Sequence, residues 1–117
     1  MTKNKASTRY YSQSQESYVA ELLGGKISAN SGAGKFSKSD ISVPEANLSI
    51  ECKTCMTPKE SFSIKKEWIE KNKAEGFSMR LNNQAICFNF GPESKNYFVI
   101  NERLMQFLCE KLKEENN

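Results

Sequence analysis

The chain alternates apolar and polar side chains along the segment Leu48-Ser49-Ile50-Glu51-Cys52-Lys53-Thr54. Successive side chains of a strand point to opposite faces, so Leu48, Ile50 and Cys52 are expected to face a core. Glu51 and Lys53 then share the other face, separated by one residue. The segment predicts a half-buried strand that carries a carboxylate and an ammonium group on one side.

A second strand is expected directly upstream, over residues 40–43, followed by a turn over residues 44–47. If the two strands pair as a hairpin, Asp40 at the start of the first converges with Glu51 on the second. Two carboxylates and a carbonyl oxygen are hard ligands suited to Mg²⁺, and Lys53 beside them can orient or deprotonate a water. The alternative is that Glu51 and Lys53 form an ordinary solvated strand face.

Helical and strand patterns alternate along the rest of the chain, which predicts an α/β fold with a small mixed central sheet flanked by helices. The expected order is α-β-β-α-β-β-α. Besides the two strands above, the expected elements are a helix at 14–23, a helix at 64–75 between an N-cap at Ser63 and a closing Gly76, a hairpin of strands at 84–90 and 97–100, and a final helix capped by Asn101.

Composition limits the classes of function. The 117 residues include 17 Lys and Arg against 14 Asp and Glu, and this net charge of +3 permits a nucleic-acid partner without requiring one. The chain has no histidine, which excludes a Ser-His-Asp triad, a Cys-His pair and a His-ligated zinc. We expect a flexible basic arm over residues 1–12 and a single domain over 13–117.

No apolar run in the chain is long enough for a membrane-spanning helix, and the polar N-terminus lacks the apolar segment of a secretion signal. We therefore expect a cytoplasmic protein without a membrane partner, in which the four cysteines stay reduced.

An ordered set of short motifs runs from the first expected helix to the start of the second. The motifs are Glu16-x-x-x-Ala20-x-x-Leu23-Gly24-Gly25, Ser31-Gly32-Ala33-Gly34, Ser39-Asp40-Ile41, Ile50-Glu51-Cys52-Lys53-Thr54 and Ser61-Phe62-Ser63-Ile64-Lys65-Lys66-Glu67-Trp68. In order, spacing and flanking residues the set resembles the PD-(D/E)XK nuclease superfamily. Within that superfamily it is similar to the small Holliday-junction-resolvase-like endonucleases of archaea and phages, over most of the chain.

This resemblance implies a restriction-endonuclease-like core of order α-β-β-β-α-β and Mg²⁺-dependent hydrolysis of DNA phosphodiester bonds, with Mn²⁺ as a substitute. It also implies branched DNA as substrate and a homodimer. Carried over to this chain, Asp40, Glu51 and the Cys52 carbonyl are metal ligands, and Lys53 acts on the attacking water. Glu16 completes the acidic site, and Glu21 is the alternative if the first helix is rotated.

Phosphate contacts are expected from a Ser/Gly loop and from the start of the second helix. At that helix start the dipole favours acidic residues, so two lysines there indicate an external anion. The alternatives are a solvated loop and a solvated helix face. The predicted contacts are Ser31, Gly32, Lys35, Lys38, Lys65 and Lys66.

The sequence thus predicts a metal-dependent endonuclease that acts on branched DNA. Three alternatives stay open: a general nicking or restriction-like nuclease, a non-catalytic DNA-binding module of the same fold, and a protein-interaction domain. Aromatic residues of the C-terminal half, among them Trp68, Tyr97, Phe98 and Phe107, are expected in the core.

Overall fold

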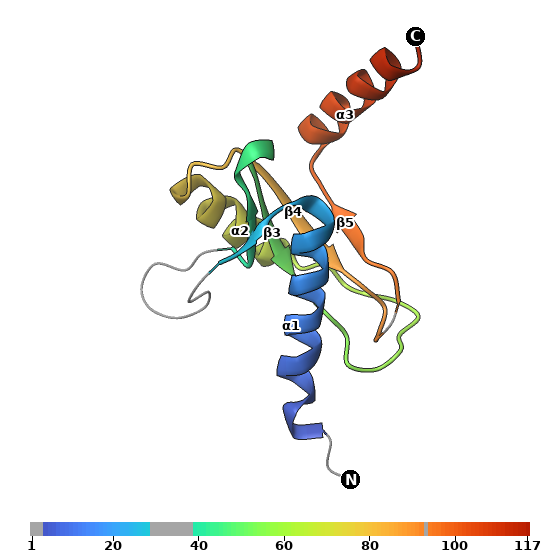
Figure 1. Cartoon of the computed structure of the whole chain (residues 1–117). Coiled ribbons are helices and arrows are strands. Elements are labelled where there is room, and N and C mark those ends of the chain that lie inside the picture. The colour runs from blue at the N-terminus through green and yellow to red at the C-terminus, as the bar shows by residue number, and fades with distance from the viewer. Residues whose placement is uncertain (1–3, 29–38, 93) are drawn as a thin grey trace.

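A mixed sheet lies at the centre of the protein. The computed structural model describes residues 4–28, 39–92 and 94–117, in which five strands follow the order β1-β2-β3-β4-β5 (Figure 1). Neighbouring strands are antiparallel except β3 and β4, which are parallel and are connected through α2. The elements are α1 (Asn4–Leu23), β1 (Lys26–Ile27), β2 (Ile41–Val43), the 3₁₀ turn η1 (Pro44–Ala46), β3 (Leu48–Cys52), α2 (Lys66–Ser78), β4 (Asn83–Phe88), β5 (Tyr97–Val99) and α3 (Glu102–Glu115).

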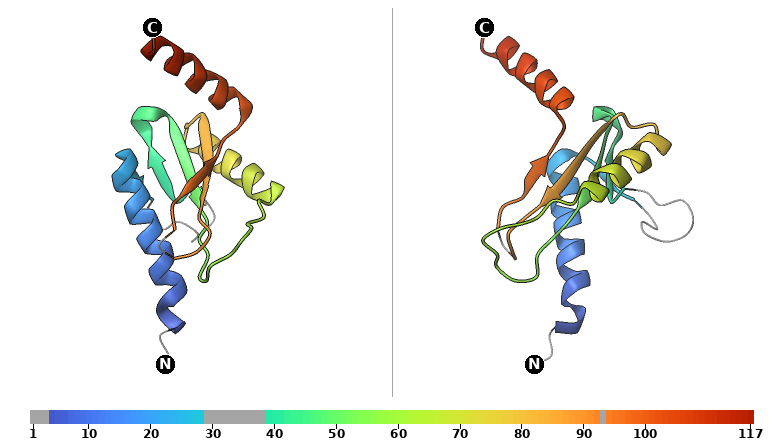
Figure 2. Two further views of the ribbon diagram at one scale, coloured as in Figure 1. Left: turned by 90° about the vertical axis from the view of Figure 1, so that its right-hand side faces the viewer. Right: turned by 180° about the vertical axis from the view of Figure 1, so that it is seen from behind.

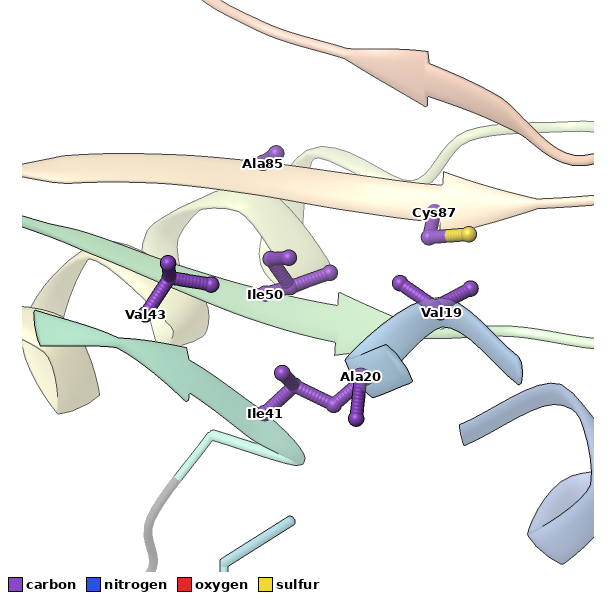
Figure 3. Packing of buried hydrophobic residues seen from close by; sticks show 7 residues of the cluster. All are labelled: Val19, Ala20, Ile41, Val43, Ile50, Ala85 and Cys87. Atoms are coloured by element: carbon purple, nitrogen blue, oxygen red, sulfur yellow. The ribbon is translucent and has the colours of Figure 1, made fainter. Parts of the chain in front are cut away.

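Two helices cover the two faces of the sheet, with α1 on one side and α2 on the other (Figure 2). The main core lies between α1 and the sheet, where Val19 and Ala20 point toward side chains of β2, β3 and β4 (Figure 3). Val19, Ile41 and Ile50 are fully buried there. The predicted α/β class with a small mixed sheet flanked by helices is therefore confirmed.

β3 is buried on both faces, although its alternating pattern predicts burial on one face only. Ile50 points into the α1 core, and its neighbour Ser49 is fully buried on the α2 face. Gly76 of α2 packs directly over Ser49, because a Cβ at position 76 would lie 2.6 Å from the Ser49 Oγ. A small polar side chain on this strand thus marks a close helix contact and not a solvated surface.

α1 is longer than the sequence pattern indicates. It begins at Asn4, so the prediction of a loose arm over residues 1–12 is wrong for residues 4–12, which are helical. The apolar spacing starts only near residue 14, so the polar residues before it give no periodic signal of a helix. None of the helices in the described ranges is long and apolar enough to cross a membrane.

Two further elements differ from the prediction. β1 was not predicted, since a two-residue strand leaves no alternating pattern; it pairs with β2 through Lys26 opposite Ser42. α2 begins at Lys66 with Lys65 as its N-cap, so Ser63 is not the cap. α2 also continues through Gly76 to Ser78, because the tight contact with Ser49 places this glycine inside the helix.

α3 extends away from the rest of the protein (Figures 1 and 2). As predicted, Asn101 caps it, with its side-chain oxygen accepting a hydrogen bond from the Leu104 backbone N–H at 2.9 Å. None of the residues of α3 is buried, so the prediction that Phe107 belongs to the core is wrong. Tyr97 and Phe98 of β5 are likewise exposed, since α3 does not fold back over that strand. The large apolar side chains exposed on α3 are Met105, Phe107, Leu108 and Leu112.

Replacing Gly76 with alanine is expected to destabilise the fold by about 1–3 kcal/mol, because the added methyl group overlaps the buried Ser49 hydroxyl and touches the Gln84 side chain. Urea unfolding monitored by circular dichroism measures the change. Ala74→Ser, at an exposed position of the same helix, is the matched control and should leave stability almost unchanged. Equal stability of both variants would contradict the proposed close packing of α2 on β3.

Candidate functional site

The pairing of β2 with β3 brings Asp40 and Glu51 together. The antiparallel register places Ile41 opposite Ile50, so the preceding residue Asp40 comes opposite Glu51. The Asp40 carboxylate accepts a hydrogen bond from the Cys52 backbone N–H at 2.8 Å, which fixes it against the end of β3. The predicted convergence of these two carboxylates is confirmed.

Asp40 is further held through its neighbour in the chain. The hydroxyl of Ser39, which is fully buried, donates a hydrogen bond to the Asn72 side-chain oxygen at 2.8 Å. Asn72 in turn donates to the Ala85 carbonyl oxygen of β4 at 3.0 Å. One buried amide on α2 thereby ties the start of β2 to the middle of the sheet, and the position of Asp40 depends on both.

α1 contributes the third carboxylate. Partial burial, together with the nearby charges of Asp40 and Glu51, raises the pKa of Glu16 to about 7. Glu21, the alternative, is exposed. The rotation of α1 therefore directs Glu16 and not Glu21 toward the strand ends.

Glu51 lies in the same electrostatic environment. Burial raises its pKa, and the charge of Asp40 adds to that effect, while Lys53 and Lys71 act in the opposite direction. A fourth carboxylate, Glu75 of α2, raises the pKa of Glu51 less strongly. Glu75 is buried and forms an ion pair with Lys71 at 3.6 Å, but its oxygens accept no hydrogen bond. The site thus concentrates negative charge in a partly dehydrated region.

Lys53 is held between an acid and an aromatic ring. Its Nζ lies 3.5 Å from a carboxylate oxygen of Glu51 and 4.3 Å from the centre of the Trp68 ring. Lys65 approaches the same ring at 5.7 Å. A cation over an indole face is attracted by the ring's quadrupole, so Trp68 positions the ammonium group beside the acids. Trp68 is half-buried and lies outside the core cluster, so the prediction that it is a core residue is wrong.

Gln15, next to Glu16, was not predicted as a site residue. It is almost fully buried, and its amide donates hydrogen bonds to the Lys53 carbonyl oxygen at 2.9 Å and to the Asn96 side-chain oxygen at 3.3 Å. Gln15 therefore connects α1 to the residue that follows the acidic strand and to the segment before β5. Its place in a run of polar residues offered no sequence signal, because a buried glutamine looks like an exposed one in the sequence.

The Cys52 thiol lies on the α1 side of β3, opposite Cys87 of β4. A hydrogen bond between the two thiols raises the pKa of Cys52 and lowers that of Cys87, so the side chain of Cys52 engages its neighbouring strand. The backbone N–H of Cys52 contacts Asp40, and the charges of Asp40 and Glu16 add to the rise of the thiol's pKa.

The donor chemistry of the site fits a hard divalent cation, since carboxylate oxygens are the ligands that Mg²⁺ prefers. Mutual repulsion among Glu16, Asp40 and Glu51 would be relieved by such a cation. As positioned, however, the described residues contain no group of three or more acidic, cysteine or histidine side chains close enough to hold a metal. The residues that would hold it are Asp40 and Glu51, with Glu16 completing the set after a side-chain adjustment.

The predicted phosphate contacts are divided between two regions. Lys65 and Lys66 lie at the start of α2 and are exposed; Lys66 also forms an ion pair with Glu70 at 3.8 Å. Lys71, further along the same helix, lies near Glu51. The other predicted contacts, Ser31, Gly32, Lys35 and Lys38, lie outside the described residues.

Comparison with models of known protein families, with curated proteins and with solved structures gives no match for this chain. The argument for a function therefore rests on the residues and on their arrangement.

The raised pKa of Glu16 predicts a pH-dependent stability. The folded carboxyl group binds its proton more tightly than the unfolded one, whose pKa is near 4.5, so folding loses stability as the pH rises from about 4.5 through about 7. In EDTA at pH 8, Glu16→Gln should be more stable than the wild type by roughly 1–2 kcal/mol, allowing for solvent screening, and equally stable at pH 4.

Urea unfolding at a series of pH values measures this difference. Glu21→Gln is the matched control on the same helix and should follow the wild type at every pH, because Glu21 is exposed. A difference between Glu16→Gln and the wild type that does not change with pH would contradict the convergence of Glu16 with the other two acids.

Proposed function

We propose that the protein is a Mg²⁺-dependent endonuclease that hydrolyses phosphodiester bonds of branched DNA. The observation that carries this proposal is the meeting of Asp40 and Glu51 at the paired ends of β2 and β3, beside the ammonium group of Lys53. Glu16 of α1 is near enough for the charges of both acids to raise its pKa. Buried acids facing one another cost stability, and a domain that only binds polyanionic DNA gains nothing from them. A metal-dependent reaction at a phosphate explains why they are present.

The order of elements also supports the proposal. The first six, α1-β1-β2-β3-α2-β4, follow the α-β-β-β-α-β order that the resemblance to PD-(D/E)XK nucleases implies. The two-residue β1, absent from the predicted elements, supplies the first of the three strands. Asp40 at the start of β2, and Glu51 and Lys53 at the end of β3, occupy the positions where that resemblance expects catalytic residues.

Each side chain has a distinct task in this reaction. Asp40 and Glu51 hold the cation, which when bound supplies charge neutralisation at the phosphate and acidifies a water. Lys53, positioned beside Glu51 and over Trp68, orients the attacking water and stabilises negative charge on the phosphate oxygens. Glu16 would complete the acidic set around the cation from the side of α1.

The exposed cations at the start of α2 provide a path for the DNA backbone. Lys65 approaches the Trp68 ring that also contacts Lys53, and Lys66 is the exposed first residue of the same helix. Phosphates that contact these lysines lead the strand toward the acids and compensate for their negative charge.

Cleavage of labelled DNA tests the proposed function. A four-way junction and a linear duplex of the same sequence are incubated with the protein in Mg²⁺, in Mn²⁺ or in EDTA. We expect metal-dependent cutting of the junction that falls by about 100-fold or more in Asp40→Asn, because the cation loses a charged ligand. Glu45→Gln, an exposed acid in the turn between β2 and β3, is the matched control and should cut like the wild type.

Other outcomes of the cleavage assay would indicate other functions. Equal cutting of junction and duplex would indicate a general nicking or restriction-like nuclease. Tight binding without metal and without cutting would indicate a non-catalytic DNA-binding module, and absence of binding at low salt would overturn a DNA function altogether.

The proposed enzyme acts as a homodimer joined through α3. A 14-residue helix with a wide apolar side is only marginally stable alone in water. We therefore expect its exposed apolar face to pack against a second protein surface. A two-fold pair presents two equal sites, as cutting of opposite strands requires.

Leu112→Lys, which places a charge in the exposed apolar side of α3, is expected to convert the dimer to a monomer at micromolar concentration, with the circular dichroism of the sheet unchanged. Light scattering after size-exclusion chromatography measures the mass. Glu110→Lys, on the polar side of the helix, is the control and should stay dimeric. A monomeric wild type would contradict the role of α3.

A further inference from the structure

A cavity of about 560 Å³ adjoins the candidate site on the α1 side of the sheet. It lies between α1 and the connection from β4 to β5, and its size is within the roughly 300–1,000 Å³ range of small-molecule sites. Its floor includes Thr54, which directly follows Lys53, and Asn89, which follows β4. These two residues come after the carboxyl ends of the parallel strands β3 and β4, where open α/β sheets commonly bind ligands.

The cavity and the acidic site share one turn of α1. Glu16 points to the acids, while its neighbour Gln15 lines the cavity and donates to the Lys53 carbonyl oxygen at 2.9 Å. Gln15 and Thr54 thus connect the cavity lining to the residue that follows β3, while the Lys53 ammonium group lies on the α2 side, over Trp68. A DNA strand that contacts Lys53 and passes around the end of β3 would bring a nearby nucleotide to the cavity.

The lining combines aromatic rings with amides and a cation. Tyr18 is 58% exposed and Phe98 is 38% exposed, so both rings offer a surface to a ligand. Asn96 and Gln15 are hydrogen-bonded to each other at 3.3 Å and carry further donor and acceptor groups. Lys95 is exposed at the same wall. Aromatic stacking, amide hydrogen bonds and an ammonium group match the base, the base edge and the phosphate of a nucleotide.

A base inside a duplex has both faces covered by its neighbours, so it cannot stack on Tyr18 or Phe98. Only a base that is unpaired, at a branch point or strand end, presents a free face and a free edge together. We infer that this cavity binds an unpaired nucleotide of branched DNA next to the bond that is cut. The inference rests on the proposed nuclease function and specifies its substrate: a junction with at least one unpaired nucleotide at the branch.

Binding is measured with the Asp40→Asn variant in EDTA, so that no DNA is cut. The probes are a junction with one unpaired 2-aminopurine at the branch, the same junction fully paired, and a linear duplex. Quenching of 2-aminopurine fluorescence reports stacking on a ring. We expect the junction with the unpaired base to bind about 5- to 100-fold more tightly than the paired junction, the range that one stacked base provides.

Tyr18→Ala should remove this difference and the quenching, whereas Tyr18→Phe should retain both because the ring remains. Phe77→Ala, which removes a more exposed aromatic ring on α2 outside the cavity, is the control and should change neither. Circular dichroism of each variant verifies that the fold is intact.

Two results would overturn the inference while leaving the proposed nuclease function intact: equal affinity for paired and unpaired junctions, or unchanged quenching in Tyr18→Ala, in a protein that still cuts DNA. Displacement of the junction by an equal concentration of dAMP would assign the cavity to free nucleotides and would overturn the DNA assignment. A wild type that neither binds nor cuts any of the DNA probes overturns the inference and the proposed function together.

Discussion

The hydrogen bond from the Cys52 backbone N–H to the Asp40 carboxylate is the contact on which the site depends. It couples the start of β2 to the end of β3, so the register of one strand pair decides which two acids meet. A shift by a single residue would turn Glu51 toward the α1 core and replace it by Cys52 or Ile50. Burial of Ile41 and Ile50 on the opposite face prevents that shift. The hydrophobic core therefore determines which acidic side chains meet at the site, although no core side chain is part of the site.

α1 and α2 complete the site from opposite sides of the sheet. α1 supplies Glu16 and, through Gln15, holds the Lys53 carbonyl oxygen. α2 supplies Trp68 over the Lys53 ammonium group, and Asn72 holds Ser39. Lys53 is thus fixed at both its backbone and its side chain by different helices. Such double support is what a charged group requires to stay in place inside a partly buried acidic region.

Sequence reasoning found the residues whose position follows from local periodicity. The alternation at 48–54 and the short turn before it are sufficient to predict that Asp40 meets Glu51, and helical spacing is sufficient to favour Glu16 over Glu21. The contacts of Trp68, Gln15 and Lys71 were missed because they depend on how each helix crosses the sheet, which no local pattern encodes. The boundaries of α2 were missed for a related reason, since Gly76 is a helix breaker in isolation but a close-packing residue against Ser49. In α3 the pattern predicts an apolar side correctly but does not say which molecule covers it.

The parallel pairing of β3 with β4 has a consequence for how the protein forms. A parallel pair cannot close as a hairpin, so the chain must complete α2 before β4 can dock beside β3. Asn72, which positions Ser39, belongs to that same crossover helix and bonds to β4. The local β2–β3 hairpin can bring Asp40 and Glu51 together early, but the Asn72 contacts that hold Ser39 form only after distant parts of the chain have met. A newly synthesised chain that has not yet reached β4 therefore lacks the buried amide contact that ties the start of β2 to the sheet.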